Sequence, residues 1–136
     1  MAGMSSAAVK KSAEKPLKFF PHDSNAVADI KIKRLIRRYG FEGYGRWWRI
    51  CEMLAANHGH KIALETDEDA EILAEELAFS DVAECLSYIK SLSDIGLLVM
   101  DGKGAVFSER MYQNAEAFGK KREAGRKGMA ARYGKS

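Results

Sequence analysis

Several features that would place the chain in a common functional class are missing from its 136 residues. No run of about 18 apolar residues exists, so no transmembrane helix is expected. The first twenty residues lack the continuous apolar segment of a signal peptide. Cysteine is nearly absent, and the two thiols, Cys51 and Cys85, fall on the apolar faces of predicted helices, as reduced core residues do. We therefore expect a cytoplasmic protein without disulfides and without a membrane partner.

The motifs of the familiar enzyme and metal classes are missing as well. The chain has no GxSxG sequence, no P-loop and no paired-carboxylate arrangement, and the glycines between positions 40 and 45 do not follow a strand. His22-Asp23 and His58-x-His60 do not supply four ligands at a recognisable spacing. The sequence therefore predicts a protein that is not an enzyme and that holds no metal and no cofactor.

Charge is divided unevenly along the chain, although the formal net charge is only +3. Residues 1–60 hold 11 Lys/Arg against 5 Asp/Glu, residues 61–101 hold 2 against 11, and residues 102–136 hold 9 against 3. Two basic ends therefore flank an acidic middle. The basic ends favour a polyanionic partner, whereas the acidic middle fits a solvated face and a protein contact equally well.

The predicted helix from Glu42 to Asn57 is the element around which the fold is expected to assemble. Its apolar residues recur at the three-and-four spacing of one helical face. They are Tyr44, Trp47, Trp48, Cys51 and Ala55, with Ile50 and Leu54 widening the stripe. Two adjacent indoles bring a large apolar area, so we expect this face to lie in the core.

The remaining pattern predicts short helices and one hairpin. Asp29 is expected to cap a helix that ends at Tyr39, where Gly40 supplies a left-handed residue. The further elements are a short strand at Lys61 to Leu64, helices at Thr66 to Phe79 and, capped by Ser80, at Asp81 to Ile95, a hairpin at Leu97 to Met100 and Ala105 to Phe107, and a helix from Ser108. This order predicts a mainly α fold with a small β-hairpin, a winged helix with an additional N-terminal helix.

Both ends of the chain are predicted to be tails. Residues 1–16 are small, polar and basic, and residues 119–136 combine Gly and Ala with Lys and Arg. Neither segment has a periodic face of large apolar residues. The predicted domain is therefore 17–118, between two flexible segments.

The segment FFPHDSNAVADIKIKRLIRRYGFEGYGRWWRICEMLA, from Phe19 to Ala55, resembles the opening signature of the phage replisome-organiser family related to the DnaD N-terminal domain. The resemblance rests on FPHDSNA, a cationic helix, YG, EGYG and an aromatic-rich helix, and it spans about Phe19 to Arg110. It implies a winged-helix domain that acts at phage or bacterial replication initiation. Such a domain binds DNA, or associates with itself and with replication proteins such as a helicase loader.

Candidate DNA-binding residues follow from the uninterrupted cations of the first predicted helix and from the basic C-terminal segment. They are Lys31, Lys33, Arg34, Arg37, Arg38, Arg46, Arg49, Lys120, Lys121, Arg122, Arg126 and Lys127. Arg46 and Arg49 of the second predicted helix extend the patch formed by the first if the two helices pack side by side. Charge contacts with phosphates fix the position of a protein on DNA without reading bases, so we expect mostly non-specific DNA binding.

The predicted helix from Asp81 to Ile95 would be the base reader of a winged helix, but its charge is wrong for that role. It carries three carboxylates against one lysine, so a contact with protein is expected instead. The candidate interface residues are Glu84, Ser87, Tyr88 and Ser91, of which the last three leave base reading open as an alternative. The functional alternatives are a protein-interaction or homo-oligomerisation module and a transcriptional regulator.

Overall fold

The computed structural model describes the backbone of residues 6–133 and the side chains of residues 7–128. The elements in chain order are α1 (Ser6–Ala13), η1 (Ala26–Ala28), α2 (Ile30–Ala56), η2 (His58–His60), β1 (Ile62–Ala63), α3 (Asp67–Glu76), α4 (Val82–Ile95), β2 (Val99–Met100), β3 (Ala105–Phe107) and α5 (Glu109–Tyr133). The fold is mainly helical, as predicted. The expected hairpin is extended by β1 to a three-stranded antiparallel sheet of order β1-β3-β2. None of the described helices combines the length and apolarity needed to cross a membrane.

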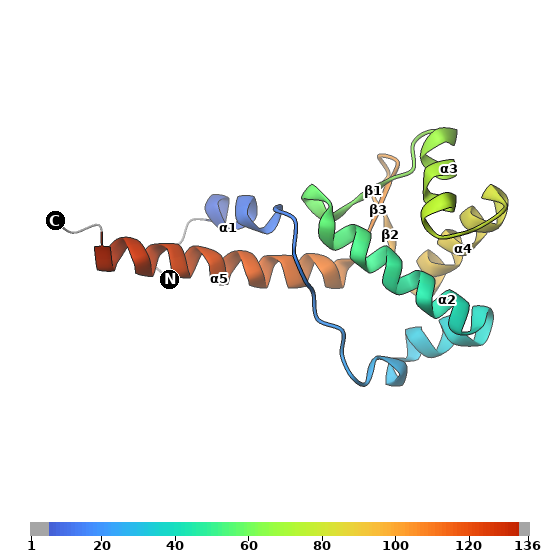
Figure 1. The fold of residues 1–136 in the computed structure, drawn as a ribbon, viewed down its shortest axis with the longest axis horizontal. Coiled ribbons are helices and arrows are strands. Elements are labelled where there is room, and N and C mark those ends of the chain that lie inside the picture. The colour runs from blue at the N-terminus through green and yellow to red at the C-terminus, as the bar shows by residue number, and fades with distance from the viewer. Residues whose placement is uncertain (1–5, 134–136) are drawn as a thin grey trace.

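Helix α2 consists of two segments joined at a glycine. The Asp29 carboxylate accepts a hydrogen bond from the Lys31 backbone N–H at 2.7 Å, which confirms the predicted cap. Gly40 has φ 69° and ψ −164°, a conformation that a side chain would strain, so the chain changes direction there. The two segments, 30–39 and 41–56, correspond to the two predicted helices (Figure 1).

The other helices begin and end close to their predicted positions. Thr66 and Asp69 form the predicted capping box of α3. Helix α4 is capped by Asp81, which accepts from the Ala83 N–H at 3.0 Å, and not by Ser80 as the sequence predicted. Gly96, in the left-handed conformation, ends α4.

The core lies where the second segment of α2 meets α3, α4 and the sheet. Its fully buried side chains are mostly aliphatic, and they include Leu35, Ile50, Leu54, Leu73, Ile89, Leu92 and Leu98. Trp47 is buried, but Trp48 lies at the edge of the core and is only half-buried. Burial raises the pKa of the Cys51 thiol to about 12 and that of Cys85 to about 11, so both remain protonated, unreactive core residues at neutral pH.

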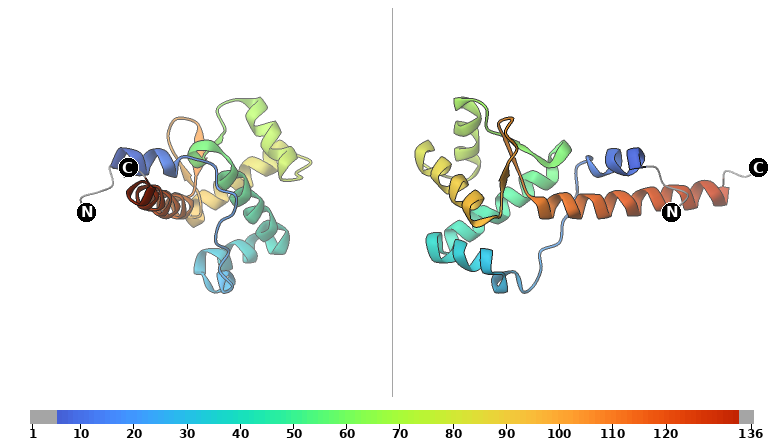
Figure 2. Two further views of the ribbon diagram at one scale, coloured as in Figure 1. Left: turned by 60° about the vertical axis from the view of Figure 1, so that its left-hand side comes forward. Right: turned by 180° about the vertical axis from the view of Figure 1, so that it is seen from behind.

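The two ends of the chain pair with one another, which differs from the prediction of two tails. Helix α5 runs without a break from the sheet through residue 133, and α1 lies along it, away from the rest of the molecule (Figures 1 and 2). Gly119 allows this close approach, because a Cβ built there would be 2.9 Å from the Ala13 backbone N and 3.0 Å from the Val9 carbonyl oxygen. Residues 1–5 and 134–136, which the predicted tails include, lie outside the described residues.

Hydrogen bonds join α1 to α5 and to His60 of η2. The Arg122 guanidinium of α5 donates to the carbonyl and the hydroxyl of Ser12 at 3.0 and 3.1 Å. The buried His60 ring lies between the Leu54 carbonyl oxygen, 2.9 Å from Nδ1, and the Ala13 carbonyl oxygen, 2.8 Å from Nε2. The predicted domain was bounded by tails that end at residue 16 and begin at residue 119. The described parts of these segments instead contact each other and His60.

Candidate nucleic-acid interface

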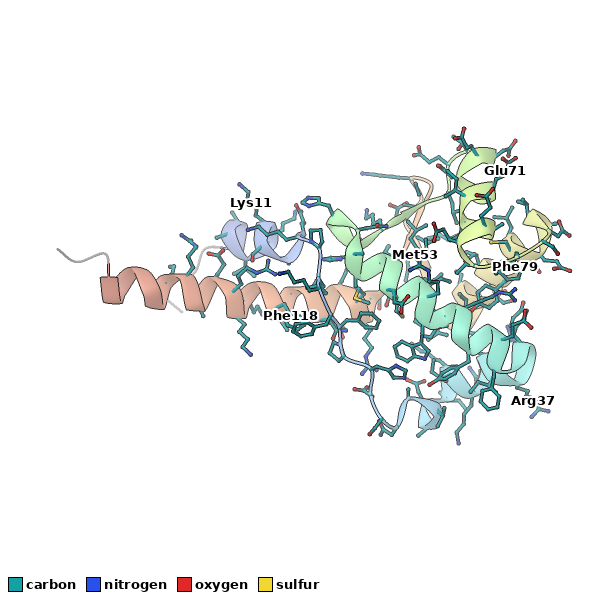
Figure 3. All side chains as sticks on the ribbon, viewed as in Figure 1. Lys11, Arg37, Met53, Glu71, Phe79 and Phe118 are labelled. Carbon is teal, nitrogen blue, oxygen red and sulfur yellow. The ribbon has the colours of Figure 1, made fainter. Side chains whose placement is uncertain are left out.

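The outer side of the first segment of α2 carries cations that no other group of the described structure neutralises. Ile32 and Leu35 turn inward, and the exposed residues on the opposite side are Lys33, Arg34, Arg37 and Arg38. Among residues 7–128, no carboxylate lies within 4.0 Å of their charged groups. Figure 3 shows Arg37 pointing away from the body of the molecule. We call these four residues the cationic face.

Lys31 was predicted to belong to this surface, and the structure gives it a second role. Its Nζ donates to the carbonyl oxygen of Gly96 at 3.2 Å. Gly96 is the C-cap of α4, where backbone carbonyls lack helical partners and favour a positive charge. Lys31 therefore ties α2 to the end of α4 and is less available to a phosphate than the cationic face.

Arg46, another predicted DNA contact, uses its guanidinium for contacts within the protein. Its Nε donates to the Leu77 carbonyl oxygen at 2.7 Å, and its Nη2 donates to the Ala78 carbonyl oxygen at 2.9 Å. The guanidinium carbon lies 3.7 Å from the centroid of the Phe79 ring, and Nη1 is 2.9 Å from the Glu42 carboxylate. Arg46 thus binds the backbone carbonyls at the C-terminal end of α3, and we do not count it as part of the interface.

Arg49 is likewise occupied by neighbouring acids. One nitrogen, Nη2, lies 2.6 Å from the Glu76 carboxylate of α3, and Nη1 lies 3.3 Å from Glu52. The hydrogen bond to Glu76 is the main reason why the pKa of Arg49 is raised. The pair with Glu76 joins α2 to α3, and the pair with Glu52 lies within α2, so Arg49 does not extend the cationic face.

The predicted basic residues of the C-terminal segment divide into paired and unpaired cations along α5. Lys120 lies 3.1 Å from Glu116, Arg126 lies 2.8 Å from Glu123, and Arg122 is bound to α1. Arg126 lowers the pKa of the Glu123 carboxyl. Lys121 and Lys127 are exposed, with no carboxylate within 4.0 Å in the described part of the chain. They lie on the helix that extends from the body, apart from the cationic face (Figure 3).

The predicted protein interface on α4 is corrected at two of its four positions. Tyr88 is only 1% exposed, and its hydroxyl donates to the Gly43 carbonyl oxygen at 2.6 Å. Ser91 Oγ lies 2.7 Å from Tyr39 Oη and is half-buried. Tyr88 follows Cys85 by three positions and precedes Leu92 by four, so the helical spacing already places it on the core face. Burial raises its pKa.

The other two predicted interface residues, Glu84 and Ser87, are exposed as expected. They share the outer side of α4 with Leu86, Lys90 and Asp94, all of them exposed. This side is net acidic and cannot follow a phosphate backbone, whereas a protein contact through Glu84 and Ser87 stays a prediction.

Comparison with protein families finds a match to the family model described as Lin1244/Lin1753-like, N-terminal, over residues 19–116. The chain belongs to this family. Comparisons with curated proteins and with solved structures find no match. The Lin1244/Lin1753-like region takes in the cationic face, the sheet and the first turns of α5, while α1 lies outside it.

The Lin1244/Lin1753-like region begins with residues 19–29, which we call the strap. The His22 ring stacks on Trp48 with centroids 3.5 Å apart, and Phe20 stacks on the same indole at 6.1 Å. Asp23 pairs with Arg110 at the start of α5. Two residues of the FPHDSNA motif therefore fix the strap to the helices: His22 contacts α2, and Asp23 contacts α5. The aromatic residues of the motif, together with the two indoles, were the signal for this contact.

Between the strap, α2 and the first turn of α5 lies a groove of about 750 Å³. Its lining is mixed, with Trp47, Ile32 and Met111 beside Asp29, Lys31 and Gln113. The buried Trp48 Nε1 finds no hydrogen-bond acceptor among the described residues. The groove separates the strap from the end of α4 and lies next to Lys31, at the edge of the cationic face.

Proposed function

We propose that the chain is a non-enzymatic, cytoplasmic DNA-binding domain of the winged-helix type that acts in phage or bacterial replication initiation. The DNA would run along the cationic face of α2 and be held through its phosphates. The support is the arrangement of the elements, the family membership and, above all, the charge of this one helical face.

The arrangement of the elements fits a winged helix. In a winged helix, the second segment of α2, α3 and α4 would be the three helices, and the β2-β3 hairpin would be the wing. Strand β1, which pairs with β3, supports this assignment. The resemblance of FPHDSNA and EGYG to replisome organisers supports a role in replication. The first segment of α2 is then an addition to the winged helix.

The observation that carries the proposal is the set of unneutralised cations on the first segment of α2. Lys33, Arg34, Arg37 and Arg38 are exposed and have no acidic partner within 4.0 Å in the described chain, so each can contact a phosphate without breaking an internal ion pair. The outer side of α4 carries Glu84 and Asp94, which phosphates repel. Contacts of this kind fix position without reading bases, so little sequence preference is expected.

The test is a salt series on the triple variant Arg34→Ala, Arg37→Ala, Arg38→Ala. The slope of log K against log[salt] should flatten by up to about 0.9 for each duplex phosphate that the variant no longer binds. The variant should unfold at the same denaturant concentration as the parent, because exposed side chains without partners contribute little to stability.

A matched control removes the same amount of charge elsewhere. Lys10, Lys11 and Lys90 are exposed and have no carboxylate within 4.0 Å among the described residues. Their replacement by Ala should weaken DNA binding far less than the Arg34/Arg37/Arg38 variant. A parent without measurable DNA binding, or equal losses in the two triple variants, would refute the assignment of the cationic face.

A further inference from the structure

An aromatic side chain stands in solvent at the end of the cationic face. Phe41 is 76% exposed, although it follows Gly40 directly and lies where the two segments of α2 meet. Its ring meets Tyr44 edge-on with the centroids 6.5 Å apart. The neighbouring Gly43 packs against Tyr39 and Tyr88, so the backbone at this point is anchored while the Phe41 ring stays outside.

The position of Phe41 relative to the cations follows from the chain itself. Phe41 comes three residues after Arg38 and four after Arg37. Three residues span at most about 11 Å even when fully extended, so the backbone of Phe41 lies within that distance of the backbone of Arg38. Ile30, 59% exposed, Arg34 and Arg37 follow one another at helical spacing on the same outer side. Exposed apolar and cationic groups therefore share one surface.

This combination suits an unpaired nucleotide better than a duplex. A base with a free face can stack on an exposed aromatic ring while cations hold the adjoining phosphates. In a duplex both faces of each base are already stacked, so a ring outside the grooves adds little. A second copy of this chain is a poorer occupant, because the four residues of the cationic face have no acidic partner within 4.0 Å in the described chain, and like charges repel. The acid next to Phe41, Glu42, is paired with Arg46.

We propose that Phe41 is a stacking platform for an unpaired base and that the cationic face therefore binds single-stranded DNA in preference to duplex DNA. This inference rests on the proposed function and specifies its substrate class. Phe41 supplies the strand preference, and the arginines supply the phosphate contacts common to both forms of DNA.

The test compares the affinity for a labelled oligo-dT strand with the affinity for a duplex of the same length, by fluorescence anisotropy at one fixed salt concentration. Phe41→Ala should lower the affinity for the single strand by roughly 5- to 150-fold, the range expected for one stacked base, and leave the duplex affinity unchanged. Phe41→Leu keeps an apolar side chain without a flat ring and should behave like Phe41→Ala. Phe41→Trp should retain the preference for the single strand.

The outcomes distinguish a failure of this inference from a failure of the proposed function. If the parent binds neither form of DNA, the proposed function is wrong and this inference falls with it. If the parent binds both forms equally, and Phe41→Ala and Phe41→Trp match it, the stacking role is overturned while the cationic face stands. A sedimentation change in Phe41→Ala with unaltered DNA affinities would assign Phe41 to self-association and overturn the inference as well.

Discussion

Replacement of Arg46 by Ala tests whether a cation that the sequence assigns to DNA serves the fold instead. The side chain donates to the carbonyl oxygens of Leu77 and Ala78, at the end of α3, and covers the ring of Phe79. The last carbonyls of a helix have no helical donors, so Arg46 supplies what the backbone of α3 lacks. We expect Arg46→Ala to destabilise the protein strongly and to spare DNA binding.

The magnitude follows from the surroundings of each contact. A hydrogen bond from a charged donor contributes about 1.5–3 kcal/mol when its partner is buried, and Leu77 is buried. Ala78 is exposed, so its carbonyl can bond to water in the variant, and the loss of this hydrogen bond lowers the free energy of unfolding by only about 0.5 kcal/mol. The cation–π contact with Phe79 adds about 0.5–1 kcal/mol, and the pair with the exposed Glu42 adds little. The free energy of unfolding should therefore fall by about 3 kcal/mol.

Urea denaturation followed by tryptophan fluorescence measures this loss. With a slope of about 1–3 kcal/mol per molar urea, the midpoint should fall by roughly 1–3 M. Glu42→Gln is the control, since it removes only the exposed ion pair and should change stability by less than about 0.5 kcal/mol. A loss below about 1 kcal/mol in Arg46→Ala, or a fall in DNA affinity as large as that of the Arg34/Arg37/Arg38 variant, would contradict the structural role.

Two further predictions concern the core and the pairing of the chain ends. Burial raises the pKa of Tyr88, whereas the unfolded phenol titrates near 10, so its contribution to stability is complete below about pH 10 and is lost as pH rises beyond it. Tyr88→Phe should cost about 1 kcal/mol at pH 7 and make stability fall less steeply above pH 10 in urea titrations; parallel curves for parent and variant would exclude Tyr88 as the cause. Gly119→Leu should drive α1 from α5 and speed hydrogen exchange in α1, because its Cβ would collide with the backbone at Ala13. Gly125→Leu, where nothing lies within 4 Å, should leave that exchange as in the parent.

Local chemistry made much of the fold predictable. The ends of helices depend on one or two residues that act over a few positions, so Asp29 and Gly40 could be assigned from the sequence alone. Most of the apolar face of residues 42–57 is buried as its spacing predicts, but Tyr44 and Trp48 are only partly buried. The cationic face was likewise visible, since a helix places Arg34, Arg37 and Arg38 on one side whatever surrounds it.

The contacts that could not be predicted from the sequence join residues that are far apart along the chain. The acceptors of Arg46 lie 31 and 32 residues away, and they are backbone carbonyls, which no side-chain pattern reveals. The pairing of α1 with α5 rests on close backbone approach at Gly119, so the absence of large apolar residues was misread as the absence of packing. Tyr88 differs from these, because its spacing from Cys85 and Leu92 was enough to place it in the core.

The pairing of α1 with α5 also sets an order of events during synthesis. Arg122 and Ser12 are 110 positions apart, so the contact closes a loop that spans most of the chain. At about 5–20 residues per second, a ribosome needs on the order of 5–20 s to add the residues between them. Throughout that interval the Gly119 surface does not exist, and α1 has no helix to pack against. The N-terminal segment, although it is made first, must therefore be among the last parts of this protein to reach its place.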